Sequence, residues 1–402
     1  MKLLTGKIVV CLSLALLTSS DAQPATPPPW SQQEAARGSL QDHLTDQQEN
    51  VDPTDQQPTE ELSVDLEPEI EITPELERLR EKVRTCLRFY YQPENAATRS
   101  PWGVMHSLIG YGVDTELVVG RKRVNAIGWL CWNGPCRGMR LLQVDGSGNL
   151  SVKQGVGYEG HEGQFLSMLA QSRVKIDYPM RVNGRELTIA DLVEFEKRTC
   201  RPRSELTFKL IGLAHYLDSD ASWTTNAGET FDIPRLIREE LSQPINGVAC
   251  GGTHRLMGFS YAVRTREKRG EPVDGEWARA KKYVEDYLQY AFKLQNRDGS
   301  FSTQWLKHRA NSGDPARQIQ TTGHILEWVV YALPKDDLDD PRVVHAVDFL
   351  STLLLRQRNS NPEVGPLGHA IHALSLYNER VFGEKPGKRA ELLVRRPRNT
   401  GR

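Results

Sequence analysis

The sequence predicts an all-α fold, an (α/α)6 toroid in which six inner helices pair with six outer helices around a ring. Six segments share one form: an entry rich in Gly, Pro, Ser or Thr leads into an apolar run, and the segments start roughly 40 to 70 residues apart. Charged, amphipathic stretches lie between them. A helix that is apolar on nearly all sides is typical of a buried position, whereas an amphipathic helix covers such a core.

The six apolar runs are the predicted inner helices. If they run parallel, their N-termini gather at one end of the ring, which we call the mouth. In chain order the entries and runs begin at Ser100 (SPWGVMH, then SLIGYGV), Gly157 (GYEGHEG, then QFLSMLAQS), Arg203 (RSE, then LTFKLIGLAHYL), Cys250 (CGGTH, then RLMGFSYAV), Gln320 (QTTGH, then ILEWVVYAL) and Gly365 (GPLGH, then AIHALSLY).

The predicted outer helices are amphipathic. The first, 74–91, has a proline at its start and apolar Leu76, Leu79 and Val83 at helical spacing. Four further stretches have the same character: 188–200, 233–241, 275–294 and 341–355. Residues 123–142 and 149–154 instead predict a small β-hairpin insertion, with turn residues at 145–148.

The two ends of the chain lie outside the predicted toroid, which covers residues 74–383. Residues 1–22 combine a lysine, a short apolar run and small residues, which predicts a cleaved signal peptide and a secreted or periplasmic protein. Residues 23–73 are rich in Pro, Gln and acidic residues, so they predict a disordered acidic linker. Residues 384–402 predict a disordered basic tail. After signal cleavage, no stable membrane insertion is expected.

Charge is divided unevenly along the chain. The first 75 residues hold 14 Asp and Glu but 3 Lys and Arg, out of totals of 52 and 51, so the remaining residues carry a net charge of about +10. A basic body favours a polyanionic ligand or an anionic surface. A solvated surface without any partner is the alternative.

Five cysteines follow the predicted signal peptide, and an exported protein is expected to pair some of them. Cys131 and Cys136 bracket a turn-like Trp-Asn-Gly-Pro loop and are the predicted disulfide. The pairing of Cys86, Cys200 and Cys250 is not predicted, and the odd number leaves at least one thiol free.

A turn motif carries a family resemblance. The segment Leu294-Gln-Asn-Arg-Asp-Gly-Ser-Phe301 follows a long outer helix and precedes an inner run. It resembles the Q-x-x-D-G-S-[WF] turn of the terpenoid cyclase and protein prenyltransferase superfamily. Residues 75–383 also resemble a group of exported planctomycete-type bacterial proteins of this architecture. The resemblance implies an exported toroid with a structural turn at Gln295 and Asp298, and it implies no particular reaction.

Three functional motifs of toroid proteins differ here. Triterpene cyclases carry an acidic D-x-D-D motif, and the nearest string, LDSDA at 217–221, is one acid short. Complement-like thioester domains carry Cys-Gly-Glu-Gln, whereas Cys250 is followed by Gly-Gly-Thr, so no thioester can close. Protein prenyltransferases bind zinc through Asp, Cys and His, a set that no single motif in this chain reproduces.

Histidine placement is the main functional signal. A toroid would bring inner-run entries to its mouth, where histidine can act as an acid, a base or a metal ligand. Helix N-termini add positive potential there. Five of the ten histidines stand near the start of an inner run: His106, His161, His254, His324 and His369.

A metal site is one prediction from this cluster. Cys250 and His254 are four residues apart at a helix start, and zinc prefers sulfur and imidazole ligands. Cys250, His254 and His324 are therefore the predicted zinc ligands, with His369 as an alternative to His324. A purely structural Cys250 is the competing interpretation.

Acid–base chemistry without a metal is the other prediction. His254 or His324 would act as the base, with Tyr261, Glu327 or Glu162 as the acid or orienting partner. The remaining candidates are predicted to bind ligand. They are the polar side chains of His106, His161 and His369, the cationic side chains of Lys209, Arg255 and Arg264, and the aromatic rings of Trp102 and Tyr158.

The preferred function is binding of an extended extracytoplasmic ligand at the mouth, with an acidic polysaccharide as the favoured class and lyase or hydrolase activity. The alternatives are a non-catalytic module that binds glycan or peptide, and isoprenoid or lipid binding by analogy of fold. The sequence does not decide between catalysis and binding, nor does it predict the oligomeric state. No P-loop, dinucleotide fingerprint, GxSxG or HExxH is present, and no nucleic-acid partner is expected.

Overall fold

A computed structural model describes residues 70–384 of the chain. These residues are mainly helical, with twelve α-helices, three 3₁₀ turns and nine short strands. The 3₁₀ turns are η1 (Gly112–Asp114), η2 (Ala249–Gly252) and η3 (Lys335–Asp337). The predicted signal peptide (1–22), the predicted linker (23–73) up to residue 69 and the predicted tail (384–402) from residue 385 lie outside the described residues.

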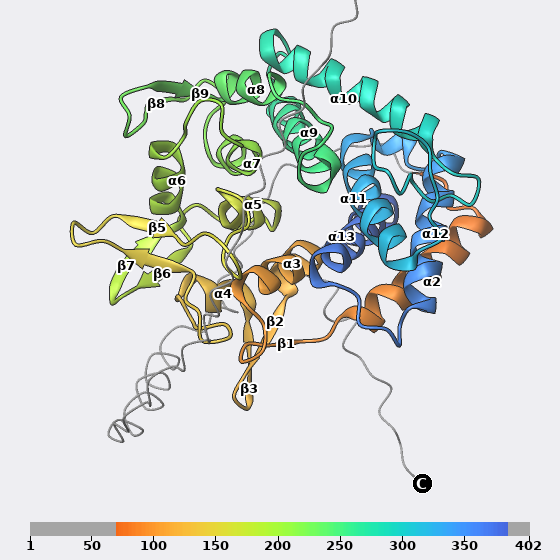
Figure 1. Ribbon diagram of the computed structural model, residues 1–402, viewed down its shortest axis with the longest axis horizontal. Coiled ribbons are helices and arrows are strands. Elements are labelled where there is room, and N and C mark those ends of the chain that lie inside the picture. The colour runs from red at the N-terminus through yellow and green to blue at the C-terminus, as the bar shows by residue number, and fades with distance from the viewer. Residues whose placement is uncertain (1–69, 385–402) are drawn as a thin grey trace, which may run out of the picture. The chain divides into compact units, whose positions relative to one another are not determined.

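Six of the helices pack mainly against one another. Each contacts the next, and the last contacts the first, so the contacts form a closed cycle. Figure 1 shows these helices toward the centre of the described part. In cycle order they are α3 (Pro101–Tyr111), α5 (Gln164–Gln171), α7 (Thr207–Tyr216), α9 (Thr253–Lys268), α11 (Pro315–Ala332) and α13 (Val364–Phe382).

The other six helices cover this inner group. α4 packs on α3, α6 and α8 pack on α7, α10 packs on α9, and α12 packs on α11. The amphipathic patterns of five of them predicted this half-buried position, whereas all six residues of α4 are buried. They are α2 (Pro74–Tyr90), α4 (Ala126–Cys131), α6 (Ile189–Arg198), α8 (Ile233–Leu241), α10 (Gly275–Leu294) and α12 (Pro341–Arg356).

The first helix lies beside a helix near the end of the chain. α2 contacts both α12 and α13, as the orange and blue ribbons of Figure 1 show. The Lys82 ammonium lies 2.5 Å from the Asp348 carboxylate, and the Tyr90 hydroxyl donates to the Leu354 carbonyl at 2.8 Å. The inner face of α2, including Leu76, Val83 and Leu87, is buried.

Three strand pairs lead directly into outer helices. The second strand of each pair ends at the N-cap of α4, α6 or α8, and these caps are Asn125, Thr188 and Asp232. Such side chains accept hydrogen bonds from backbone amides that have no partner within the helix. The pairs are β2 (Glu116–Val119) with β3 (Lys122–Asn125), β6 (Pro179–Val182) with β7 (Arg185–Thr188), and β8 (Ser222–Thr224) with β9 (Thr230–Asp232).

The sequence predicted one β-hairpin, but the structure contains more strand pairs than that. The described residues contain four small sheets, the fourth being β4 (Leu142–Val144) with β5 (Leu150–Val152), and β1 (Glu94–Asn95) adds in parallel to β2. The predicted turn at 145–148 is confirmed, since Asp145 Oδ1 accepts the amide of Ser147 at 2.9 Å. The predicted strand at 123–142 was wrong over Ala126–Cys131, which is the buried helix α4.

Four inner helices, α3, α9, α11 and α13, begin before their predicted apolar runs. α11 begins at Pro315 and α13 at Val364, so the Gly and Thr residues predicted as entries lie inside helices. They are contact points instead: a Cβ added to Gly323 would lie 2.9 Å from Ala370, and one added to Gly368 would lie 2.4 Å from the His106 carbonyl oxygen. Small residues here let α13 approach both α11 and α3 closely.

The predicted disulfide is not formed. All five cysteines within residues 70–384 carry free thiols. Cys131 ends α4 in the core, whereas Cys136 is placed by backbone pairing with Met139, so each is buried in its own packing environment. Burial raises the pKa of the Cys136 thiol to about 12, as expected for a buried group whose charged form is disfavoured.

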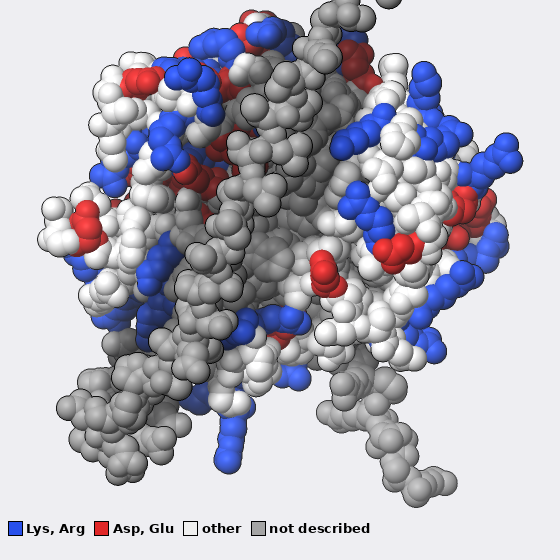
Figure 2. Space-filling view, viewed as in Figure 1, with Lys and Arg blue, Asp and Glu red and all other residues white. Residues whose placement is uncertain are grey.

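Basic and acidic side chains are mixed on the visible face. Figure 2 shows Lys and Arg around the periphery of the described part, interspersed with Asp and Glu. The excess of bases therefore does not by itself mark a site on this face. Among the helices of residues 70–384, none is long and apolar enough to cross a membrane.

Candidate functional site

The five histidines of the predicted cluster lie close together. The ring centroid of His254 is 5.4 Å from that of His161, 5.5 Å from that of His324 and 5.1 Å from that of His369. His106 joins the group at 5.5 Å from His369. Residues separated by up to 263 positions in the chain thus form one contiguous cluster, which we call the histidine cluster.

Cys250 is held by an unusual backbone. It lies in the 3₁₀ turn η2 with φ 49°, and Gly251 and Gly252 follow with φ 62° and 82°. Left-handed backbone is costly for a residue with a Cβ, and such strain is concentrated at functional sites. A Cβ at Gly251 would lie 2.3 Å from the Trp305 ring, so glycine is required there for steric reasons too.

His254 is the second residue of α9, directly after this turn. Neither of its ring nitrogens has a hydrogen-bond partner among the residues that the structure describes, although both are buried. A buried polar group without a partner is costly, and nearly all such groups in folded proteins are satisfied. A bound ligand or metal ion would satisfy it.

His324 comes from the neighbouring inner helix, α11. Its Nδ1 lies 2.7 Å from the carbonyl oxygen of Gln320, one turn earlier. A hydrogen bond from Nδ1–H to this carbonyl leaves Nε2 with a free lone pair. Histidines that bind metals are usually oriented in this way, through the nitrogen that does not bind the ion.

Cys250, His254 and His324 together form a potential metal site. One ligand atom from each residue can be chosen so that all three lie within 4.8 Å of one another. Thiolate and imidazole are the ligands that zinc prefers, and three protein ligands leave a fourth position open for water or substrate. The three residues predicted from sequence as zinc ligands are therefore close enough to share one ion.

Glu327 connects two further histidines to this site. Its carboxylate lies 2.8 Å from Nδ1 of His369 and 2.5 Å from Nδ1 of His372, and all three side chains are buried. These hydrogen bonds leave Nε2 of His369 free of the carboxylate. The His369 ring lies 3.9 Å from the His324 ring, centroid to centroid, so Glu327 orients a histidine that adjoins the metal site.

The outer histidines of the cluster have their own partners. His106 Nδ1 lies 2.8 Å from the Trp102 carbonyl, and the Trp102 ring packs on it with centroids 4.1 Å apart. His161 Nδ1 lies 2.8 Å from the Glu205 carboxylate. Trp102 and the outer histidines thus line the surroundings of the site.

The pKa values of the inner histidines favour neutral imidazole. Burial, reinforced by the neighbouring histidines, lowers the pKa of His106 to about 3 and holds the pKa values of His254 and His324 well below their usual range. Neutral imidazole is the form that binds metals. Burial raises the pKa of the Cys250 thiol to about 12, so this sulfur would ionise only with a cation beside it.

Two predicted residues lie away from the cluster. Tyr261 bonds to Nδ1 of His215 at 2.9 Å and stacks on Tyr331, two turns along α9 from His254. Arg264 donates to the Tyr331 carbonyl at 2.8 Å. Tyr261 lies near the middle of α9 and Arg264 nearer its C-terminal end, about 10 and 15 Å along the helix axis from His254 because each helical residue advances about 1.5 Å. The structure therefore does not bring them to the histidine cluster, and their roles in catalysis and ligand binding stay predictions.

Two predicted basic residues are occupied by buried ion pairs. Arg255 Nε lies 2.8 Å from Glu240, which ties α9 to α8. Lys209 Nζ lies 2.5 Å from Glu196, and both side chains are 1% exposed. Arg255 therefore joins two helices through its ion pair, and its ligand-binding role stays a prediction. Lys209 also contributes to the wall of a pocket, as does Tyr158.

Sequence reasoning missed two residues of the site. His372 shares Glu327 with His369 and stands one turn later on α13, a spacing that the sequence displayed. Trp305 packs edge-on to His324 with centroids 5.5 Å apart. Its position comes from the irregular segment between α10 and α11, which no helical pattern could have predicted.

Comparisons with protein-family models, curated proteins and solved structures found no match for this chain. Any functional conclusion therefore depends on the sequence patterns and on the geometry of the site.

Proposed function

We propose that this chain is an exported zinc-dependent enzyme with an (α/α)6 toroid fold that cleaves an extended acidic polysaccharide by hydrolysis or elimination. The closed cycle of six inner helices, each covered by outer helices, supports the toroid. Cys250, His254 and His324 would hold the ion at its mouth.

The two ring nitrogens of His254, which are buried and have no hydrogen-bond partner among the described residues, are the observation that carries this proposal. A structural histidine would be expected to use at least one ring nitrogen, as His106, His161, His324 and His369 all do. His254 instead stands between a thiol and a second imidazole whose ligand atoms are within reach of one ion.

The ion and the residues around it would have separate roles in catalysis. A zinc ion, when bound, supplies Lewis-acid chemistry, by polarising an oxygen of the substrate or activating water. His369, oriented by the Glu327 carboxylate, would accept or return the proton. For a uronic acid chain, the same arrangement suits removal of the proton next to the carboxylate, which is the first step of elimination.

Metal content and turnover of the full chain, measured together, test this function. After zinc loading and dialysis, we expect about one zinc ion per chain by mass spectrometry, as three-ligand sites bind. Polygalacturonate should yield new reducing ends on hydrolysis, or ultraviolet-absorbing unsaturated ends on elimination. His254→Ala and Cys250→Ser should each lose both the zinc and the turnover.

The control is His308→Ala, because this histidine is exposed and lies outside the cluster. It should keep the metal and the turnover. Circular dichroism must show that the His254 variant is folded, with His254→Gln as a second variant of similar size. If the wild-type protein bound no zinc, or if the His254 variant retained one zinc ion per chain, the proposed metal site would be contradicted.

A further inference from the structure

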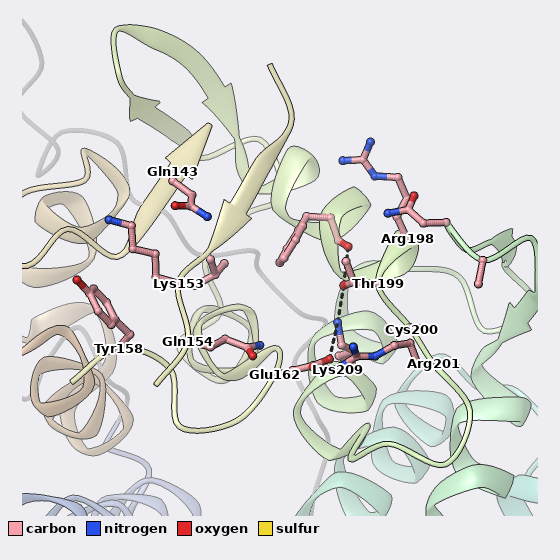
Figure 3. Close-up of a pocket in the computed structure, with 14 residues that line it drawn as sticks. Gln143, Lys153, Gln154, Tyr158, Glu162, Arg198, Thr199, Cys200, Arg201 and Lys209 are labelled. Carbon is pink, nitrogen blue, oxygen red and sulfur yellow. Dashed lines mark hydrogen bonds and ion pairs between the residues drawn. The ribbon is translucent and has the colours of Figure 1, made fainter. Parts of the chain in front are cut away.

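A pocket of about 610 Å³ lies among the β4–β5 hairpin, α6 and α7. Its walls come from the β4–β5 hairpin and the segment after it, from the end of α6, and from the start of α7. Figure 3 shows Lys153 and Tyr158 on one side of the pocket, and Arg198, Thr199 and Lys209 on the other. This volume is typical of pockets that bind small ligands or one unit of a polymer.

The pocket is rich in positive charge. Lys153, Arg198, Arg201 and Lys209 line it, against one acidic side chain, Glu162. Two of these bases are neutralised: Lys209 pairs with Glu196 at 2.5 Å, and Arg201 pairs with Glu162.

The other two bases have no carboxylate partner within the part of the chain that the structure describes. Lys153 lies over the Tyr158 ring, with its nitrogen 5.6 Å from the ring centroid, and Arg198 donates to the Asn149 amide oxygen at 3.2 Å. Cations that stand on opposite walls without a counterion suit a ligand that carries more than one negative charge.

At two places in the sequence, a residue that lines the pocket directly follows a residue that belongs to the histidine cluster or packs on it. His161 contacts His254 within the cluster, while Glu162 lines the pocket. Phe208 packs on His254 with centroids 5.1 Å apart, while Lys209 lines the pocket. The wall of the pocket and the histidine cluster are therefore built in part from the same two chain segments, 161–162 and 208–209.

We propose that this pocket is the subsite that holds an acidic sugar unit of the substrate, with Lys153 and Arg198 binding carboxylates and Tyr158 stacking on a sugar ring. Aromatic rings suit the apolar faces of sugars, and Arg suits the planar carboxylate. The inference rests on the proposed function for its link to catalysis, although the pocket binds its ligand without the metal.

Calorimetric titration of the full chain with an oligomer of six galacturonic acid units tests this subsite, with maltohexaose as the neutral counterpart. At low salt we expect the acidic oligomer to bind at least tenfold more tightly than the neutral one. The double variant Lys153→Ala/Arg198→Ala should bind the acidic oligomer at least tenfold more weakly, and Lys153→Gln alone should show part of that loss.

The matched control is Arg121→Ala/Lys122→Ala, which removes the same charge from the exposed β2–β3 turn. Binding should be unchanged in this variant. An equal loss in the control, or equal binding of the two oligomers, would overturn the subsite. His254→Ala should retain binding while losing turnover, so a protein that binds but never cleaves contradicts the proposed reaction and leaves the subsite standing.

Discussion

Gly251 links the backbone of the candidate metal site to its surroundings. Its φ of 62° and the nearness of Trp305 both exclude a side chain, and it follows the thiol-bearing Cys250 directly. The positions of Cys250 and His254 therefore depend on a residue that has no functional group of its own.

Gly251→Ala is expected to displace the η2 turn and to weaken zinc binding. Left-handed backbone costs a non-glycine residue about 1–2 kcal/mol, and the clash with Trp305 adds to that cost. Gly270→Ala is the matched control, since it has φ 70° and no atom within 4 Å of an added Cβ. Thermal unfolding and zinc titration of both variants would measure the difference. Equal losses of stability would show that Trp305 imposes no constraint.

The site residues were predictable where they depended on position along a helix. Cys250, His254 and His324 were expected as ligands, and their ligand atoms do lie together. The partners of Glu327 were not predicted. Glu327 stands three residues after His324 on α11, but its carboxylate contacts His369 and His372 on the neighbouring helix α13. Contacts between helices depend on packing distances, here set by Gly323 and Gly368, that no single-helix pattern contains.

At the scale of the element, α5 has an unusual N-terminus. Its N-cap is Gly163, which has no side chain that could accept a hydrogen bond from the first backbone amides of the helix. The Glu159 carboxyl instead accepts a hydrogen bond from the Phe165 amide at 2.6 Å. The second oxygen of Glu159 is buried and has no hydrogen-bond partner among residues 70–384. Burial, with the nearby Glu196 charge, raises the pKa of Glu159 well above its usual value.

Glu159→Gln is expected to change how stability depends on pH. A carboxyl whose pKa is raised on folding stabilises the native state fully at low pH, and that contribution is lost as pH rises from about 4.5 through the folded-state pKa. The glutamine keeps the hydrogen bond to Phe165 and does not titrate. The variant should therefore gain stability relative to wild type as pH rises from 4.5.

Urea unfolding across this pH range checks the prediction. Glu194→Gln is the control, because Glu194 is exposed and pairs with Lys197 at the surface. It should change stability by less than about 0.5 kcal/mol. A Glu159 variant that loses stability as pH rises would show that the carboxylate is needed in its ionised form.

Helix positions were predicted well where amphipathic periodicity ran unbroken. α8 and α10 have the predicted bounds, Ile233–Leu241 and Gly275–Leu294. Strand pairs were missed because each is only three or four residues long, too short for alternation to stand out. α4 was missed for the same reason, since its six residues are all buried and show no polar face.

At the scale of the whole molecule, α2 completes the packing of helices from the other end of the chain. Leu87→Ala is expected to destabilise the protein by about 2–5 kcal/mol, because the side chain is 1% exposed against this junction. Phe89→Ala on the same helix is the control, since its side chain is 41% exposed. Denaturant unfolding should separate the two variants. Similar small effects would mean that α2 is not part of the cooperative unit.

The closed cycle of inner helices also sets the order in which the protein can fold. α3 emerges early in synthesis, yet one of its neighbours is α13, which ends at Phe382. Gly110 on α3 packs against Ile371, and that contact has no partner until almost the whole described region has been made. Contacts so distant in sequence slow folding and prolong exposure of apolar surface. A nascent chain of this protein would therefore need protection from aggregation until its last inner helix arrives.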